Sequence, residues 1–573
     1  MVNINELHSQ FKLPISYNKD SKETPIEVTK DLELCEFVED DKNCMYDHIF
    51  TPKSLFGKEL LQQWSKYYTS DVNFLKDNQK LVKNLNITDS VSPELSEDIW
   101  NQWKEIKNNT SFKENYQYIE WEYLESFNRS PLFLEFLSLY TLTSPVLSLL
   151  SPVLLLIVPF FILKLQNQNV TVKTYFSHLM KLLNQIPLGR MFNIHNLSWE
   201  KRVYAIISFI FYLLQIYQNI QFCFKFKTNM VYIHEFIEKL KLYTTTTIKS
   251  ISQFIDTSSS YKTFTEFNHS LEQNKLTLID FNAELNKVTP YQNNLKKLPN
   301  IGYVMKIFYE IYSNIDYHKT LLYSFGFNGF LDNINSLKDN ITNKHVNKCK
   351  FSKNKITITD GYYCCLKDNN PIKNTYNIDK NMLITGPNAA GKTTLLKSTL
   401  FNLLLSQQIG FGCYKKATIN PFHYFHCYIN IPDTSGRDSL FQAEARRCRE
   451  ILNSLESNND KRHFCIFDEL YSGTNPYEAI SSAYAYLLFL NKNSNINFIL
   501  TTHYIQLCEK IELLHSTTIL NKHMDVIPDE NDFNYTYKLV DGISNIKGGI
   551  KVLKDLDYPI EIINTTQKII LTL

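Results

Sequence analysis

The residues with the clearest chemistry form a glycine-rich turn between an apolar run and a leucine-rich segment. The run Met382 to Thr385 predicts a short buried strand, and the segment with Leu395, Leu396 and Leu400 predicts a helix. The turn between them reads G-x-x-x-x-G-K-T, which is the P-loop pattern in its required strand–turn–helix context. The sequence therefore predicts a site for a nucleoside triphosphate.

The residue types in this turn suit phosphate binding. Gly386 and Gly391 let the backbone bend so that its amides point into one concavity, and the helix N-terminus adds partial positive charge. Lys392 can reach the terminal phosphates, and the Thr393 hydroxyl can ligate Mg²⁺. The residues expected to contact the nucleotide here are Gly386, Pro387, Asn388, Ala389, Ala390, Gly391, Lys392, Thr393 and Thr394.

Hydrolysis needs further groups, and candidates follow at the ends of two apolar runs. Residues 464–469, FCIFDE, predict a buried strand whose end places Asp468 on the magnesium shell and Glu469 near the attacking water. Residues 498–503, FILTTH, predict a second strand, and its terminal His503 can hydrogen-bond the γ-phosphate side. A single histidine at a strand end is otherwise usually structural.

A serine-rich segment lies between the glycine-rich turn and the Asp468-Glu469 pair. Ser435-Gly436-Arg437 is predicted to be a loop, and Ser439 lies near the start of an amphipathic helix. A loop of this kind suits phosphate binding in trans, from a second subunit. An ordinary helix N-cap is the alternative interpretation of Ser439.

Composition narrows the class of protein. A chain of 573 residues with 44% hydrophobic and 14% aromatic residues can bury several cores, so we expect more than one domain. The net charge of +2 is too small for the whole chain to attract nucleic acid or membranes electrostatically. A nucleic-acid role therefore needs local basic patches or a clamp that encloses the nucleic acid. The 11 cysteines are scattered without a C-x-x-C pair, which indicates neither a zinc site nor a disulfide framework. We expect an intracellular reducing compartment, cytoplasm or nucleus, and no cleaved secretory signal.

The pattern along the chain predicts three regions. Residues 1–27 are polar and without a clear period, and are expected to be an irregular lead-in. Residues 28–345 are mostly helical in spacing, and their last part, from 225, suits extended arms. Residues 346–573 begin with alternating β-branched residues and continue into the nucleotide-binding strands, which predicts an α/β domain.

Two runs within the helical region, 136–163 and 203–224, carry no charged side chain. Each is longer than the ~20 residues that cross a bilayer, so a membrane hairpin is one interpretation. A buried helical core or an oligomer interface is the other. The features that oppose a membrane hairpin are prolines in the first run, amides in the second and a basic connection between them that conflicts with the positive-inside tendency. They are Pro145, Pro152 and Pro159; Gln215, Gln218, Asn219 and Gln221; and Lys164, Lys173, Lys181, Arg190, Lys201 and Arg202.

Taken together, these motifs resemble the MutS family of DNA mismatch-repair ATPases over most of the chain. The loop Thr385–Thr393 matches the family's TGPNxxGKxT, and Lys373–Ile378 is similar to its segment that contacts adenine, which adds Asn374 to the site. The other segments that carry the resemblance are Ser439-x-Phe441-x-x-Glu444, DELYSGTNP (Asp468–Pro476), TTHY (Thr501–Tyr504), YKLVDGISNIKGGIKVLKDLDYP (Tyr537–Pro559) and, upstream, the lever-like Asp31–Trp64 and Phe330–Leu337.

The resemblance implies an ABC-type α/β P-loop ATPase at the C-terminus, preceded by a helical lever or clamp-like region. It implies a homodimer or heterodimer through the ATPase domain, in which Ser439 reaches the partner's ATP. Lys392, Glu469 and His503 would be catalytic, and Thr393 and Asp468 would hold Mg²⁺. Double-stranded DNA would be clamped through backbone contacts and shape rather than read base by base.

The sequence also departs from the family pattern. About 27 residues precede the lever-like start, so we expect no mismatch-reading domain here, and Phe37-Val38-Glu39 lies in the lever-like stretch where such a domain's wedge does not belong. Ala389-Ala390 replaces the usual Met-Gly, as in ABC transporters, although their LSGGQ signature is missing. The two apolar runs are absent from typical repair members. The alternative functions are a membrane-associated ABC-type ATPase that does not act on DNA, and a nucleotide-switched scaffold that does not hydrolyse ATP.

Overall fold

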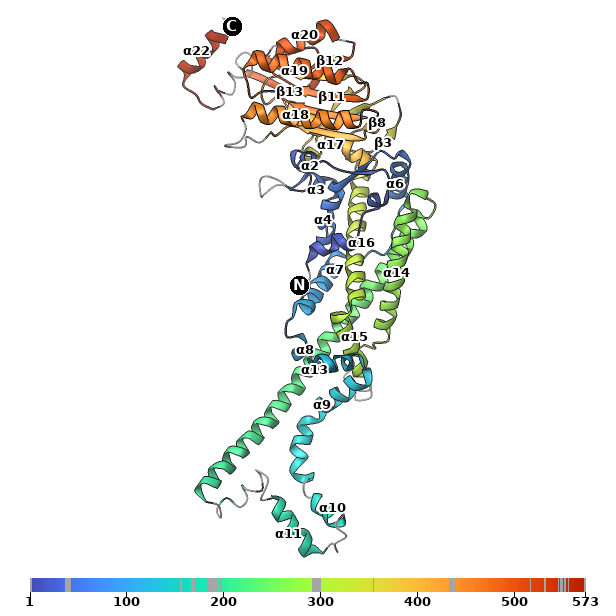
Figure 1. The fold of residues 1–573 in the computed structure, drawn as a ribbon, viewed down its shortest axis with the longest axis vertical. Helices are drawn as coiled ribbons and strands as arrows, with labels where there is room; N and C mark the ends of the chain where they lie inside the picture. Colours follow the sequence, from blue (N-terminus) through green and yellow to red (C-terminus); the bar gives the residue numbers. More distant parts are fainter. Residues whose placement is uncertain are drawn as a thin grey trace. The chain divides into compact units, whose positions relative to one another are not determined.

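The structure is a computed structural model of the chain (Figure 1). The residues that it describes are 3–36, 43–154, 157–165, 171–183, 189, 191, 194, 198–290, 300–353, 355–431, 439–515, 517–529, 532–544, 546, 550, 553–554 and 556–570. Phe37-Val38-Glu39, Ser435-Gly436-Arg437, Arg190 and parts of Tyr537–Pro559 lie outside the described residues. The chain divides into two compact units, one of 94–248 and 275–321, the other of 3–93, 249–274 and 322–573. The predicted boundaries after residues 27 and 345 stay predictions.

A six-stranded sheet dominates the second unit, in the order β13-β12-β6-β11-β10-β9. Its neighbouring strands are parallel except for β12 and β13, which are antiparallel. The central strands are apolar and almost wholly buried, as expected of parallel strands with both faces covered. The strands are β6 (Asn381–Thr385), β9 (Tyr424–Tyr428), β10 (His463–Asp468), β11 (Ile496–Thr501), β12 (Ile519–Asp529) and β13 (Asp532–Asp541). The three strands predicted around the site are confirmed.

The register of this sheet decides which side chains meet. Asp468 at the end of β10 pairs with Thr501 at the end of β11, and Thr501 pairs with Ile384 on β6. Three parallel strands therefore end at the same edge, where the glycine-rich loop leaves β6. Ligands of open α/β sheets bind at such carboxyl edges.

Helices and a second sheet complete this α/β region. The sheet order is β5-β4-β8-β3-β7, with strands Asn374–Asn377, Thr357–Gly361, Lys416–Ile419, Asn347–Phe351 and Phe411–Gly412. The helices are α17 (Lys392–Gln408), α18 (Leu440–Ser457), α19 (Pro476–Asn491), α20 (Ile505–His515) and α22 (Ile560–Ile570). Helix α17 contacts strands of both sheets, which explains why it is buried on all its faces. A mixed α/β region is thus confirmed.

The N-terminal residues differ from the expected irregular lead-in. Leu7, Phe11, Leu13 and Ile15 are buried, and they fix short helical turns, the second of which begins at Pro14. The elements up to residue 93 are η1 (Ile4–Glu6), α1 (Leu7–Gln10), η2 (Pro14–Tyr17), β1 (Ser21–Glu23), α2 (Ile26–Asp31), α3 (Met45–Phe50), α4 (Leu55–Glu59), α5 (Leu61–Lys66), β2 (Tyr67–Thr69) and α6 (Val72–Asn84). Strand β1 pairs with β2.

This N-terminal segment is bonded to the C-terminal end of α17. The Gln408 amide donates to the carbonyls of Trp64 and Tyr67 at 2.8 and 3.2 Å, and the Tyr46 hydroxyl donates to the Gln408 carbonyl at 2.6 Å. The Gln407 amide donates to Thr69 O at 3.2 Å. All these groups are buried or nearly so, so their hydrogen bonds fix the helix that starts at the glycine-rich loop.

The first unit is helical, as predicted. An aromatic core holds it together, in which the Phe112 ring stacks on Tyr312 with centroids 3.9 Å apart, near Tyr118 and Phe308. Its helices are α7 (Pro93–Asn108), α8 (Phe112–Asn115), η3 (Glu122–Arg129), α9 (Pro131–Leu154), α10 (Val158–Leu165), α11 (Val172–Leu183) and α15 (Ile301–Ser313). Three further helices, α13 (Trp199–Ser258), α14 (Thr265–Asn286) and α16 (Ile315–Thr342), belong in part to each unit.

The two apolar runs are not a buried core, which corrects that interpretation. The first run continues from α9 into α10 and includes residues 155–156, which lie outside the described residues. Residues 136–150 of this run and the whole second run belong to helices long and apolar enough to cross a membrane, Pro131–Leu150 and Trp199–Ser258 respectively. Only 17% of the most apolar stretch is buried in the former and 11% in the latter. The membrane and oligomer-interface interpretations therefore remain.

The structure contains one disulfide among its described residues, which the scattered cysteines of the sequence did not indicate. It joins Cys364, in the short helix η7 (Cys364–Leu366), to Cys413 next to β7. The other described cysteines are free. Cys364 and Cys413 are separated by 49 residues in the sequence without a recognisable pattern, so their pairing depends on the five-stranded sheet, which contains both β4 and β7.

Candidate nucleotide-binding site

The loop after β6 has the backbone that its glycines were expected to allow. Gly386 has a φ of 154° and Gly391 a φ of 89°, both in the region that side chains disfavour. A Cβ on Gly391 would lie 3.1 Å from the Tyr537 ring, a tight contact, and the positive φ disfavours any other residue there. Gly391 is the N-cap of α17, which leaves the first amides of that helix directed at the loop.

Lys392 is the buried cation of the site. Its side chain folds over the loop, where Nζ donates to the carbonyls of Gly386 and Pro387 at 3.1 and 3.2 Å. Burial lowers the pKa of Lys392 below its ordinary value, although Glu469 and Asp468 oppose this effect. A buried ammonium group paired mainly with neutral carbonyls has unmet electrostatic demand, which a phosphate would satisfy.

The two residues predicted to hold Mg²⁺ touch each other. The Thr393 hydroxyl donates to Asp468 Oδ2 at 2.7 Å, and the Thr501 hydroxyl donates to the other carboxylate oxygen. Among the described residues, no group of three or more His, Cys, Asp or Glu could hold a metal ion. This donor set fits Mg²⁺, which takes one carboxylate and a hydroxyl and otherwise keeps water and substrate phosphates as ligands.

Glu469 and His503 meet at the carboxyl edge of β10 and β11. Glu469 Oε1 lies 2.9 Å from His503 Nε2, and that same nitrogen lies 3.1 Å from Lys392 Nζ. Nε2 can either donate to Glu469 or accept from Lys392, so one proton decides which neighbour it binds. The hydrogen bond from His503 lowers the pKa of Glu469, with burial opposing it and Lys392 adding to it. The predicted pair of base and histidine is thus brought together.

For the ATP hydrolysis that the sequence predicts, His503→Ala is expected to move the acid limb of the pH–rate profile to higher pH. With its pKa lowered, Glu469 stays ionised, and able to act as a base, to a lower pH than an ordinary glutamate. Loss of His503 raises that pKa, so protonation and loss of rate begin at a higher pH. His515→Ala, at the end of α20, is the control. An acid limb that His503→Ala leaves in place would contradict the assigned pairing.

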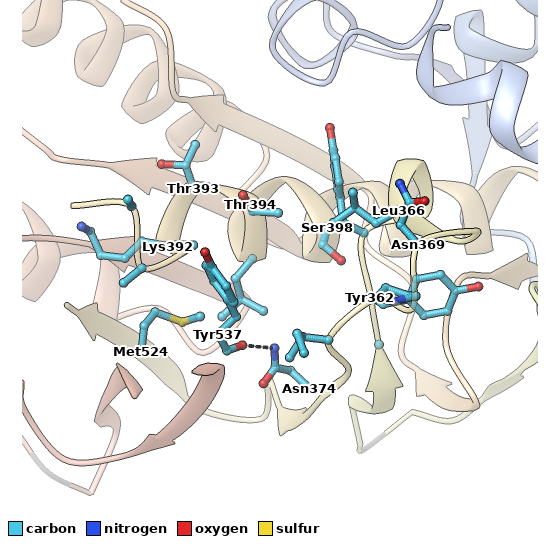
Figure 2. Close-up of a pocket in the computed structure, with 18 of the residues that line it drawn as sticks. Tyr362, Leu366, Asn369, Asn374, Lys392, Thr393, Thr394, Ser398, Met524 and Tyr537 are labelled. Carbon is cyan, nitrogen blue, oxygen red and sulfur yellow. Dashed lines mark hydrogen bonds between the residues drawn. The ribbon is translucent and has the colours of Figure 1, made fainter. Parts of the chain in front are cut away.

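A cavity of about 690 Å³ adjoins the loop (Figure 2). Asn388 to Leu395 line one side, and Glu469 is at its border. The remaining wall comes from residues that sequence reasoning missed, among them Tyr362, Tyr363, Leu366, Asn369, Ile372, Ser398, Met524 and Tyr537. Tyr537 is the one with a sequence signal, because it opens the Tyr537–Pro559 segment. The volume and mixed lining suit a nucleotide.

Asn374 lines this cavity, but its amide is engaged elsewhere. Its Nδ2 donates to Tyr537 O at 3.0 Å (Figure 2). Its Oδ1 accepts from Leu539 N at 2.9 Å. The side chain therefore fixes β5 against β13 and positions the Tyr537 ring. A direct contact of Asn374 with adenine stays a prediction.

Ser439 is not brought into the cavity. It is the N-cap of α18, where its hydroxyl accepts from Gln442 N at 3.3 Å and its own amide donates to Gln442 Oε1 at 2.9 Å. The alternative N-cap interpretation is thus confirmed. Its side chain is exposed, which leaves contact with a second subunit as a prediction.

Glu444 links α18 to the segment after the catalytic carboxylates. Its buried carboxylate accepts from Ser472 N and Gly473 N, both at 3.1 Å, and from the Ser472 hydroxyl at 2.9 Å. A Cβ on Gly473 would lie 2.7 Å from Phe441 N, so the segment passes close to the helix. Within the Ser439-x-Phe441-x-x-Glu444 motif, Glu444 therefore holds the backbone of residues 472–473 against the first turn of α18.

Glu444→Ala is expected to lower the free energy of unfolding by about 1–3 kcal/mol, because two amides lose their acceptor. Denaturant titration measures this change. Glu450→Ala is the matched control, since Glu450 lies on the same helix with its side chain 56% exposed. It should change stability by less than about 0.5 kcal/mol. Equal stability of the two variants would contradict the anchoring role of Glu444.

Comparison with known proteins identifies the C-terminal part of the chain. Residues 382–573 match the family model for MutS domain V. The DNA mismatch repair protein MutS of Persephonella marina is 28% identical over 233 residues, 39% of this chain and 26% of the relative. MutS of Orientia tsutsugamushi is 31% identical over 209 residues, 35% of this chain and 22% of the relative. The DNA mismatch repair protein Msh3 of Dictyostelium discoideum is 28% identical over 198 residues, 32% and 13% of the two chains.

The match covers about a quarter or less of the length of these relatives. The match to the family model begins on β6 and includes the glycine-rich loop, Asp468, Glu469 and His503. The residues that the structure gathers at one sheet edge are therefore those of the matched domain. Residues 382–573 of this chain are thus similar to domain V of the MutS family.

Proposed function

We propose that this chain binds and hydrolyses Mg-ATP. The observation that carries the proposal is the convergence of five residues at the carboxyl edge of the parallel strands β6, β10 and β11, beside a cavity of nucleotide size. They are Lys392, Thr393, Asp468, Glu469 and His503. P-loop ATPases use these residue types for phosphate, metal and water. The proposed fold of the region is accordingly an ABC-type P-loop ATPase.

Each residue has a distinct task in this proposal. Lys392 exchanges its loop carbonyls for the terminal phosphates, and the amides at the start of α17 bind their oxygens. Thr393 and Asp468 hold Mg²⁺, which neutralises the charge that develops on the phosphates. Glu469 orients or deprotonates the attacking water, and His503 holds Glu469 ionised and contacts the γ-phosphate side. The part of the cavity that Ile372 and Tyr537 line binds the adenine base of ATP.

We further propose a dimer through this domain, in which Ser439 of one subunit completes the other subunit's site. Its exposure at the start of α18 supports this arrangement. Mixing the Lys392→Met and Ser439→Ala variants tests it, because a mixed dimer contains one site with both residues intact. Recovered turnover above that of either variant alone is expected. No recovery in dimers shown to exchange subunits would contradict the shared site.

The proposed effector is double-stranded DNA, and the proposed location is the cytoplasm or nucleus. Support comes from the family, whose members named above are DNA mismatch repair proteins. With a net charge of +2, contact should depend on local basic patches, and affinity for a labelled duplex should fall steeply with salt. Fluorescence anisotropy with and without ATP measures this affinity. A protein that hydrolyses ATP but never binds DNA would favour the membrane-associated alternative, for which the exposed apolar helices are the supporting observation.

A further inference from the structure

The two apolar runs are the largest exposed apolar feature of the described residues outside the candidate site. On α13 the side chains of Phe211, Leu213 and Leu214 are 66%, 48% and 48% exposed. On α9 those of Phe136, Val146 and Leu149 are 70%, 56% and 57% exposed. Monomeric soluble proteins rarely leave patches of this size in water, so some apolar partner covers them.

The distribution of apolar residues around α13 identifies the kind of partner. At 100° per residue, the exposed apolar residues cover an arc of roughly 200° of the helix surface, and the remaining side includes the buried apolar Ala205 and Ile216. The exposed residues are Val203, Tyr204, Ile206, Ile207, Ile210, Phe211, Leu213, Leu214, Tyr217 and Ile220. Pairing with a second copy of the chain needs one apolar stripe and leaves charges on the other face. No charged side chain occurs between residues 203 and 224. A helix that is apolar all round fits a lipid bilayer.

The prolines of α9 are accommodated as membrane helices accommodate them. Pro145 frees the carbonyl of Thr141, and the Ser144 hydroxyl donates to that oxygen at 2.9 Å. Pro152 frees the carbonyl of Ser148, and the Tyr212 hydroxyl of α13 donates to it at 2.9 Å. Backbone groups at these two prolines are thus satisfied without water, which removes the objection that those prolines raise.

Other polar side chains in the runs also bond within the protein. The Asn219 amide of α13 donates to the Ser148 hydroxyl of α9 at 2.6 Å, which ties the two helices together. The hydroxyls of Ser138 and Thr143 donate to carbonyls one turn back, Leu134 O at 2.7 Å and Leu139 O at 2.8 Å. Such bonds remove most of the cost of placing these groups in hydrocarbon.

The ends of the α13 run carry residues typical of a membrane interface. Lys201 and Arg202 precede it, and Lys225 and Lys227 follow it. Trp199, 77% exposed, and Tyr204 lie at the first end, as aromatic belts do. At 1.5 Å per residue, the run from 203 to 224 is roughly 33 Å long, close to the ~30 Å hydrocarbon core.

We propose that the apolar runs of α9 and α13 are embedded together in a lipid bilayer. Gln218 and Gln221 lie within two turns of Lys225, from where long side chains reach the headgroups. Gln215 is exposed nearer the middle and opposes insertion. The basic residues at both ends of the α13 run lie in the headgroup layers.

Flotation of the full chain with phosphatidylcholine vesicles tests the proposal. Wild-type protein is expected to float, to resist extraction by alkaline carbonate and high salt, and to have its apolar runs protected from protease only when vesicles are present. The double variant Leu213→Lys/Leu214→Lys should partition at least about 100-fold less into vesicles. The control Leu242→Lys/Leu276→Lys replaces leucines that are 60% and 55% exposed outside the runs, and should float like wild type.

Binding of a fluorescent ATP analogue by every variant shows that the ATPase region is folded and separates this inference from the proposed function. Wild-type protein that stays in the aqueous fraction, or leaves vesicles in carbonate, would overturn the proposal. So would an oligomer in lipid-free buffer that protects both runs, because a second copy would then cover them. If the protein floats with vesicles but does not hydrolyse ATP, the bilayer inference is supported and the proposed ATPase activity is contradicted.

Discussion

Glu469→Gln is expected to lower the rate of ATP hydrolysis by about 10²–10⁴-fold while ATP binding persists. Glu469 follows Asp468 at the end of β10 with a φ of 54°, a conformation that directs it away from the strand. Its carboxylate lies 2.9 Å from His503, and that contact lowers its pKa, so it is ionised and available to the attacking water at neutral pH. Glutamine keeps the shape but cannot accept a proton.

Two measurements check this prediction together. Single-turnover hydrolysis gives the chemical rate, and equilibrium binding of ATP shows that the site is intact. Glu509→Gln, an exposed glutamate on α20, is the matched control and should leave both unchanged. If Glu469→Gln hydrolyses ATP at the wild-type rate, another group activates the water and the assignment is wrong.

Lys392→Met is expected to weaken ATP binding by about 100-fold or more. The ammonium group is buried, with carbonyls of its own loop and His503 within 3.2 Å. Replacing these neutral partners with phosphate oxygens converts a buried, poorly compensated charge into a paired one. Methionine fills a similar volume but supplies no charge.

The same substitution should not destabilise the protein. Burial lowers the pKa of Lys392, so removing the charge removes a cost of folding. The melting temperature without ATP should stay the same or rise, while the increase that ATP produces in wild type should disappear. Lys397→Met is the control, because Lys397 lies on the same helix but pairs with Glu33 at 3.2 Å. Unchanged ATP affinity in Lys392→Met would contradict the assignment of this loop as the phosphate-binding P-loop.

The parts of the site predicted from sequence are those encoded locally. An apolar run, two glycines and a following helix determine the loop from Gly386 to Gly391, and strand ends fix Asp468 and His503. The parallel register then brings these ends together. Local patterns were sufficient because each residue sits within a few positions of its own strand or helix.

Other features depend on contacts between distant segments. The cavity wall combines Tyr362 and Met524, which no local pattern connects, and the amide of Asn374 is satisfied by β13 rather than by a ligand. The Cys364–Cys413 bridge is of the same kind. The prolines of α9 opposed a membrane helix until the partners of the Thr141 and Ser148 carbonyls were known.

The most direct test of the proposed function is the steady-state rate of Mg-ATP hydrolysis by the full chain, in detergent or vesicles, with and without duplex DNA. Glu469→Gln supplies the blank. We expect turnover well above the blank, and stimulation by DNA that disappears at high salt. A wild-type rate equal to that of Glu469→Gln, with ATP still bound, would contradict the assignment of this chain as an ATPase.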